Sequence, residues 1–163
     1  MLKTTGVCCL LSCVLSACGG AAADQSGAQT LASALKGDAK AVAGDNPQCK
    51  LFTPAEVAKF IGRPVKAGEN AALGTGCQWE ARSGVGNVMI QVVPARYHEP
   101  PTAAPTFKKL PDVGRAGFVV QDMGWKAGAI TGPEAVVVVI SDGASSEANA
   151  VALLKETIKR RTP

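Results

Sequence analysis

A short apolar segment near the start of the chain, residues 6–17, runs directly into Cys18. One basic residue, Lys3, precedes it. The segment is too short to cross a bilayer as a permanent helix, which needs about 20 apolar residues, but it has the length of a signal-peptide core. We therefore expect residues 1–17 to be a removable leader, so three of the six cysteines never enter the folded domain.

The end of this segment, Leu15-Ser16-Ala17-Cys18, resembles the bacterial lipobox, in which the cysteine receives a diacylglycerol and becomes the first residue after cleavage. A thiolate is the nucleophile suited to this transfer. We predict that Cys18 is lipidated; the alternative is a plain secretory signal with a chance cysteine. Two or three acyl chains hold a protein firmly where one does not. The predicted location is the cell membrane or outer membrane, with the domain facing the periplasm or the exterior.

Two cysteines, Cys49 and Cys77, remain for the domain. In the oxidising compartment outside the cell membrane, an even pair predicts a disulfide. Closing the loop between them stabilises the fold by about 3–4 kcal/mol on the chain-entropy model. The alternative is a two-thiol metal site, which lacks a third ligand because His98 is the only histidine. We expect no metal and no cofactor.

The stretch after Cys18 is rich in Ala, Gly, Ser, Gln and Asp and has almost no large apolar side chains. Such a stretch cannot bury enough surface to offset its ordering entropy. We therefore expect a leader over 1–17, the lipidated cysteine and a flexible tether over 18–46, and a single domain over 47–163.

The formal net charge is only +4 and aromatic residues make up 4%, which argues against a nucleic-acid partner.

Two helices are predicted, one at each end of the domain. Thr53, Pro54 and Glu56 form the pattern of a capping box with proline at the first helical position, and Gly62 is a typical helix end. The second helix follows Ser145 or Ser146, either of which suits the cap. Its apolar stripe is expected at Val151, Leu154 and Ile158.

Between the helices, six segments have strand composition or apolar alternation: residues 63–68, 77–83, 86–97, 114–122, 125–132 and 134–142. The run Val136–Ile140 contains no polar residue, which predicts cover on both faces. Residues 94–111 carry five prolines and predict a long loop, with a short helical turn from Phe107 to Leu110. The predicted fold is α+β, a mainly antiparallel sheet of about six strands with an N-terminal and a C-terminal helix packed on it.

Catalytic chemistry has weak support in this sequence. His98 lies next to Glu99 in the proline-rich loop, and the serines lack a Gly-x-Ser-x-Gly setting. We predict a protein that is not an enzyme and a binding surface formed by the long loop and a nearby strand, with Tyr97, His98, Phe107 and Trp125. Trp79 is expected to pack over the disulfide instead.

The leading functional hypothesis is a lipid-anchored, non-catalytic binding module of the cell envelope. Its partners would be the membrane, through the anchor, and an envelope protein or a small apolar ligand. The alternatives are an inhibitor or immunity lipoprotein that blocks an exported toxin or hydrolase, and a hydrolase that uses His98.

Several short motifs also resemble a family of small bacterial lipoproteins of unknown function, abundant in actinobacteria. They are a cysteine before a Leu-x-Thr-x-x-Glu-Val helix, a second cysteine before an aromatic residue, and a Gly-x-x-Ala-like step into the second half of the sheet. In this chain they fall at Cys49, Thr53, Glu56, Val57, Cys77, Trp79, Gly114 and Gly117. The resemblance implies an α+β fold akin to the Mog1/PsbP type and an exported, lipid-anchored module, and it implies no reaction.

Overall fold

The computed structural model describes residues 46–142 and 145–162. The predicted leader, Cys18 and the tether up to residue 45 lie outside the described residues. Within them the chain forms helices, strands and two single 3-10 turns. In chain order these are α2 (Pro54–Ile61), β1 (Glu69–Ala71), η2 (Ala72–Gly74), β2 (Gly76–Glu80), β3 (Asn87–Pro94), η3 (Ala95–Tyr97), β4 (Lys108–Lys109), β5 (Arg115–Gln121), β6 (Trp125–Thr131), β7 (Glu134–Ser141) and α3 (Glu147–Arg161).

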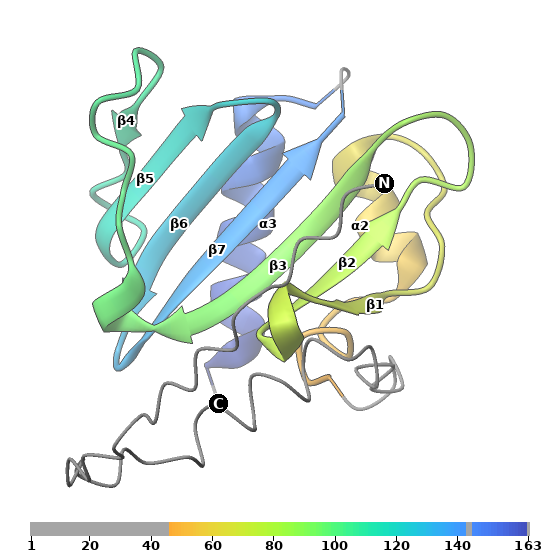
Figure 1. Ribbon diagram of the computed structural model, residues 1–163, viewed down its shortest axis with the longest axis horizontal. Coiled ribbons are helices and arrows are strands. Elements are labelled where there is room, and N and C mark those ends of the chain that lie inside the picture. Colours follow the sequence, from red (N-terminus) through yellow and green to blue (C-terminus); the bar gives the residue numbers. More distant parts are fainter. Residues whose placement is uncertain (1–45, 143–144, 163) are drawn as a thin grey trace, which may run out of the picture.

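The strands form one open antiparallel sheet in the order β1-β2-β3-β7-β6-β5-β4. The long strands β3 and β7 pair along their whole length at its centre, which joins two meanders into a single sheet (Figure 1). This arrangement confirms the α+β class and the antiparallel sheet. Short connections account for the antiparallel pairing within each meander, because hairpins join only antiparallel neighbours.

The described residues hold seven strands, where about six were expected. The predicted edge strand over 63–68 is wrong, since only Val65 makes an isolated bridge, to Ala81, and the edge strand β1 follows later. The predicted helical turn from Phe107 to Leu110 is also wrong. Lys108 and Lys109 pair with β5 as the short strand β4, because the end of the loop runs alongside an otherwise unpaired sheet edge.

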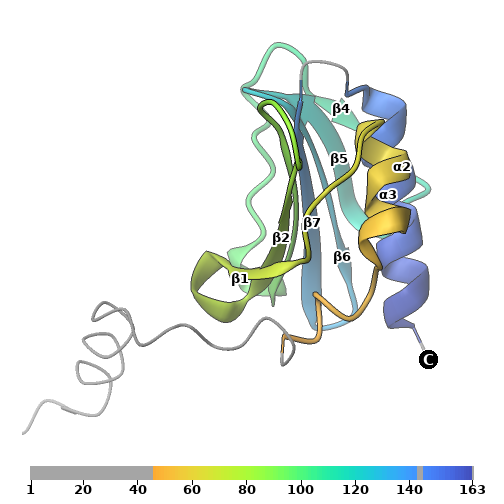
Figure 2. The same cartoon turned by 90° about the vertical axis from the view of Figure 1, so that its right-hand side faces the viewer.

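Both helices lie on the same face of the sheet, as Figure 2 shows edge-on. Alternate residues of the strands point into this layer, so Val88, Ile90 and Val92 of β3 are buried while their neighbours are only half-buried. The same alternation holds in β7, where Val137 and Val139 are half-buried. The expectation that β7 is covered on both faces is therefore wrong: one face is closed by helices and the other is partly open.

The start of α2 has the predicted capping box. The Thr53 hydroxyl accepts from the backbone N–H of Glu56, and the Glu56 carboxylate accepts from the backbone N–H of Thr53. Gly62 closes the helix in the left-handed conformation. A cap of this kind stabilises a helix by about 1 kcal/mol.

Helix α3 begins at the predicted cap, where Ser146 accepts from the backbone N–H of Asn149. Its buried stripe differs from the one expected. Ala150, Leu153, Leu154 and Thr157 are buried, whereas the predicted Val151 and Ile158 are half-buried at its margins. The hydroxyl of Thr157 donates to the carbonyl of Leu153, so a polar residue can occupy the stripe, which apolar residue type alone would not indicate.

The predicted disulfide between Cys49 and Cys77 is present. It joins the segment before α2 to β2, next to the fully buried Trp79. Asn46, assigned to the tether by the sequence, already belongs to the domain: it is buried and its amide donates to Asn70 and to the carbonyl of Gly76.

The sheet has two ends, which we call the lower pole and the upper pole. The described chain starts (orange) and α3 ends at the lower pole in Figure 1, while the β2–β3 and β5–β6 connections and the start of α3 lie at the upper pole. None of the helices in the described ranges has the length and apolar composition needed to cross a bilayer.

Candidate functional site: a groove on the open face of the sheet

The open face of the sheet carries a groove of about 360 Å³ beside the long loop. Strand register explains its floor, since Gln91 and Val137 are cross-strand partners and Gly128 pairs with both Val137 and Phe118. Residues opposite one another in a ladder point to the same face. The groove is lined by Gln91, Val93, Tyr97, His98, Glu99, Phe118, Lys126 and Val137.

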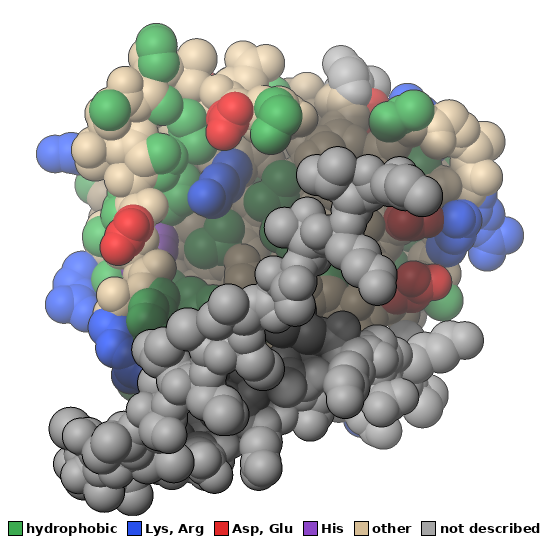
Figure 3. Space-filling view, in the orientation of Figure 1, with side chains coloured by type: hydrophobic (Ala, Val, Ile, Leu, Met, Phe, Trp, Pro, Cys, Tyr) green, Lys and Arg blue, Asp and Glu red, His purple; other side chains and the backbone are tan. Residues whose placement is uncertain are grey.

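The wall of the groove is built by the proline-rich loop folding over β5. The ring of His98 lies 5.5 Å from that of Phe118, and Phe107 stacks on Phe118 with centroids 6.1 Å apart. Phe118 is consequently buried on the face that lacks helices. Figure 3, which looks onto this face, shows hydrophobic side chains over β5 and β6 with the histidine at their edge.

A glycine in β6 makes this packing possible. A Cβ atom on Gly128 would lie 2.8 Å from the Phe118 ring and 3.2 Å from Cε1 of His98. Distances this short exclude a side chain, so the aromatic ring lies directly across the β6 backbone.

His98 is held by a hydrogen bond as well as by packing. Its Nε2 lies 3.2 Å from the carbonyl oxygen of Ala116. A carbonyl oxygen only accepts, so Nε2 carries a proton and donates. One ring nitrogen is thus used to fix the loop on β5, at the residue where β5 bulges and Ala116 has a positive φ of 52°.

The charged groups of the groove differ in their surroundings. Lys126 is half-buried beside the apolar floor and makes no ion pair with a described residue. Glu99 is exposed on the loop. Water screens an exposed charge more than a half-buried one, so the ammonium group dominates the field inside the groove and favours an anion there.

The structure divides the predicted binding surface. Tyr97 and His98 line the groove and Phe107 supports its wall, but Trp125 points to the helix side of the sheet, because its partner across the ladder is the buried Ile140. Trp125 instead lines a second, larger hollow of about 550 Å³ at the upper pole. The long loop and Trp125 are therefore not one surface.

Sequence reasoning did not single out Phe118 or Lys126. A signal for Lys126 was present: it stands between the apolar Trp125 and Ala127 in a strand, which places it on the face away from the core. Phe118 gave no such signal, because a phenylalanine in a strand is typical of either face.

Within residues 46–142 and 145–162, no three His, Cys, Asp or Glu side chains are grouped so as to hold a metal ion. Comparisons with protein-family models and with curated proteins found no match for this chain.

Proposed function

We propose that this protein is a lipid-anchored lipoprotein of the bacterial cell envelope whose domain is a non-catalytic binding module. Its ligand is a small amphiphile, with an apolar body and one carboxylate or phosphate group, held in the groove on the open face. The observation that carries the proposal is the half-buried Lys126, which makes no ion pair with a described residue and lies beside the apolar side chains of Phe118, Val93 and Val137.

The shape and chemistry of the groove support a ligand of this class. Small-molecule sites are concave, mostly apolar and carry a few polar groups that orient the ligand. Here the apolar floor would receive the ligand body, and the Lys126 ammonium would receive its acidic end. Gln91 adds a neutral hydrogen-bonding group from β3.

The role of His98 supports binding over catalysis. His98 packs on Phe118 and donates through Nε2 to a backbone carbonyl, and among the described residues no carboxylate is hydrogen-bonded to its ring to orient it as a general base. These contacts are those of a wall residue that gives the groove its shape.

The lipobox at Cys18 supports the envelope location, and the disulfide fits an oxidising compartment. We further propose that the domain belongs to the family of small actinobacterial lipoproteins that its motifs resemble and that its fold is of the Mog1/PsbP type. The one-sided helix layer on an open antiparallel sheet is compatible with that fold.

The ligand proposal is tested by titrating the protein with anilinonaphthalene sulfonate, an amphiphilic anion whose fluorescence rises in apolar sites. Lys126→Gln removes the positive charge and is expected to raise the dissociation constant about tenfold, the effect of losing one charge-assisted contact. Lys155→Gln, an exposed lysine of α3 on the opposite side of the sheet, is the matched control and is expected to change nothing. Equal effects of the two substitutions would rule out the groove as the site.

The anchor is tested separately. Cys18→Ser is expected to move the protein from the membrane fraction to the soluble fraction, and intact-mass measurement of the wild type should show the mass of the acyl chains on the residue that follows the leader. A wild-type protein that is soluble and carries no added mass contradicts the anchor.

A further inference from the structure

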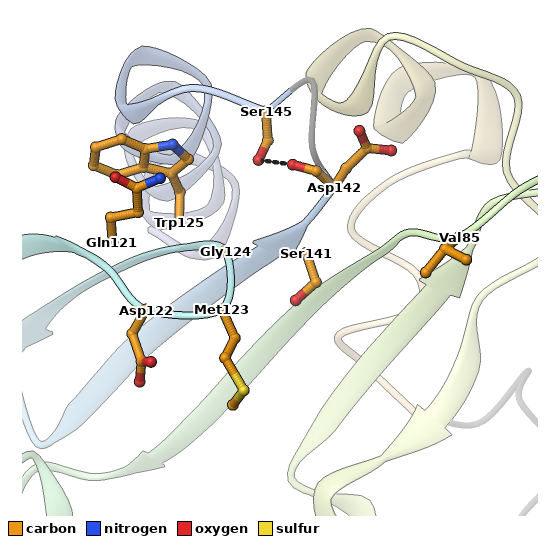
Figure 4. Close-up of a pocket in the computed structure, with 9 residues that line it drawn as sticks. All are labelled: Val85, Gln121, Asp122, Met123, Gly124, Trp125, Ser141, Asp142 and Ser145. Carbon is orange, nitrogen blue, oxygen red and sulfur yellow. Dashed lines mark hydrogen bonds between the residues drawn. The ribbon is translucent and has the colours of Figure 1, made fainter.

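The upper pole of the domain displays apolar side chains from separate connections. Met123, in the β5–β6 turn, is 96% exposed, and Val85, in the β2–β3 connection, is 92% exposed. Together with the half-buried Trp125 they border the hollow of about 550 Å³ at this pole (Figure 4). Exposed apolar groups that gather around one hollow are typical of interaction sites.

The turn that carries Met123 is not one that methionine stabilises. Met123 has a positive φ of 42°, a conformation that suits glycine and asparagine and is unfavourable for other residues. Its side chain is also almost fully in water, so it adds nothing to the core. Neither the turn nor the core therefore accounts for a methionine at this position.

Two acidic residues, Asp122 and Asp142, line the hollow, and no basic residue does so among those that the structure describes. Asp122 is exposed beside Met123. Arg63 binds the carboxylate of Asp142 at 3.0 Å. The groups that a partner can contact are therefore the apolar side chains and the exposed carboxylate of Asp122. Figure 4 shows Asp122 and Met123 on the side of the turn away from Trp125.

The exposed charge at the pole indicates the chemistry of the partner. The Asp122 carboxylate repels the anionic headgroups of a lipid surface, so a membrane is an unsuitable occupant. A second copy of the chain is disfavoured too, because two such poles would bring their Asp122 carboxylates together.

We infer that Val85, Met123 and Trp125 at the upper pole form a docking surface for another envelope protein, which presents an apolar side chain next to a lysine or arginine. The apolar side chain enters the hollow and the basic group binds Asp122. The location of the partner in the envelope rests on the lipid anchor proposed above, whereas the surface itself does not depend on the ligand groove.

The test uses the full-length protein, in the cells that make it, with the photo-crosslinking residue benzoylphenylalanine at position 123. The same residue at position 73 is the control, because Leu73 is also exposed and also has a positive φ, but lies in the β1–β2 turn at the other pole. We expect position 123, and not position 73, to crosslink to one protein identifiable by mass spectrometry.

The crosslinked protein is then purified and titrated against the full-length protein in nanodiscs. Met123→Asn is expected to weaken binding at least tenfold while the melting temperature stays the same or rises, since asparagine suits the turn. Leu73→Asn is expected to leave binding unchanged. Asp122→Asn should weaken binding and reduce its dependence on salt concentration.

The inference is overturned by crosslinks from position 123 to lipid only or to a second copy, by equal crosslinks from position 73, by no crosslink at all, or by Met123→Asn binding as the wild type does. A failure here is distinguishable from a failure of the proposed function. The Lys126→Gln titration reports the groove and the Cys18→Ser fractionation reports the anchor, and neither involves the upper pole.

Discussion

The two faces of the sheet are made by alternate residues of the same strands, but they have different neighbours. In β3, Ile90 is completely buried under the helices, while the adjacent Met89 points to the open face and is half-buried. In β6, Ala127 is buried on the helix side and Lys126 stands beside the groove. One face therefore packs against the helices to form the core, and the other keeps half-buried side chains around the groove.

On the covered face, ion pairs and hydrogen bonds also join the two helices to each other. The Arg160 guanidinium of α3 binds the carboxylates of Glu56 and Glu156 and the carbonyl of Leu51, and lies 4.2 Å above the Phe52 ring. These contacts join the end of α3 to the start of α2. On the open face, the loop packs on the sheet through His98 and Phe118, and it covers only part of the sheet. The part that the loop does not cover forms the groove.

The largest effect is expected from truncating neighbouring residues on opposite faces. Ile90→Ala should lower the free energy of unfolding by about 2–5 kcal/mol, the range for emptying a packed site. Met89→Ala should lower it by less than about 1 kcal/mol, because a half-buried side chain leaves no enclosed cavity. Urea unfolding followed by circular dichroism measures both free energies. Similar losses for the two variants would contradict the claim that the covered face contributes more to stability than the open face.

A smaller effect is expected from the disulfide, which braces the covered face at the start of the domain. Cys49→Ser with Cys77→Ser should lower the free energy of unfolding by about 3 kcal/mol, mainly because the unfolded chain gains freedom. Binding of anilinonaphthalene sulfonate to the folded fraction should stay unchanged, since neither cysteine lines the groove. A folded double variant with altered dye affinity would show that the two faces are coupled.

The smallest effect on stability is expected from the ion pairs of Arg160 with Glu56 and Glu156, and it depends on pH. The Arg160 guanidinium, and then the hydrogen bonds from Thr53, lower the pKa of Glu56 from 4.5 to about 2. A carboxyl whose pKa is lower in the folded state stabilises the fold above its unfolded value and loses that contribution as pH falls. Wild type should thus be more stable than Glu56→Gln at pH 7, and the difference should shrink between pH 4.5 and 2.

Melting temperatures of the two proteins across this pH range give the measurement. Glu99→Gln is the control, because Glu99 is an exposed carboxyl on the loop that makes no ion pair within residues 46–142 and 145–162. A constant difference between wild type and Glu56→Gln down to pH 2 would mean that the carboxylate charge is not what fastens the helices.

Local patterns were sufficient for some of the fold. The capping box of α2, the cap of α3 and most strand positions follow from residues within a few places of one another, and the structure has them. The failures involve distant partners: β4 exists only because the end of the loop meets β5, and Thr157 is buried because α3 turns that side to the sheet.

In the candidate site, too, some residues could be predicted from local sequence and others only from the fold. His98 and Tyr97 could be singled out because both lie in the proline-rich loop and His98 is the only histidine of the sequence. Phe118 could not, since only the fold places it under that loop. Trp125 lies on the other face of the sheet and lines a different hollow, and the sequence does not show which face of a strand the loop covers.

By itself, the sequence determined where α2 begins, that Cys49 and Cys77 suit a disulfide, and which residues of each strand share a face. These depend on local hydrogen bonding, on cysteine chemistry and on the two-residue period of a strand. Only the tertiary structure decided which face the helices cover and where the loop folds back, and thereby that Lys126 and His98 share a groove while Trp125 lies elsewhere. The period of a strand sorts side chains into two sets, but what packs on each set depends on segments far away in the chain.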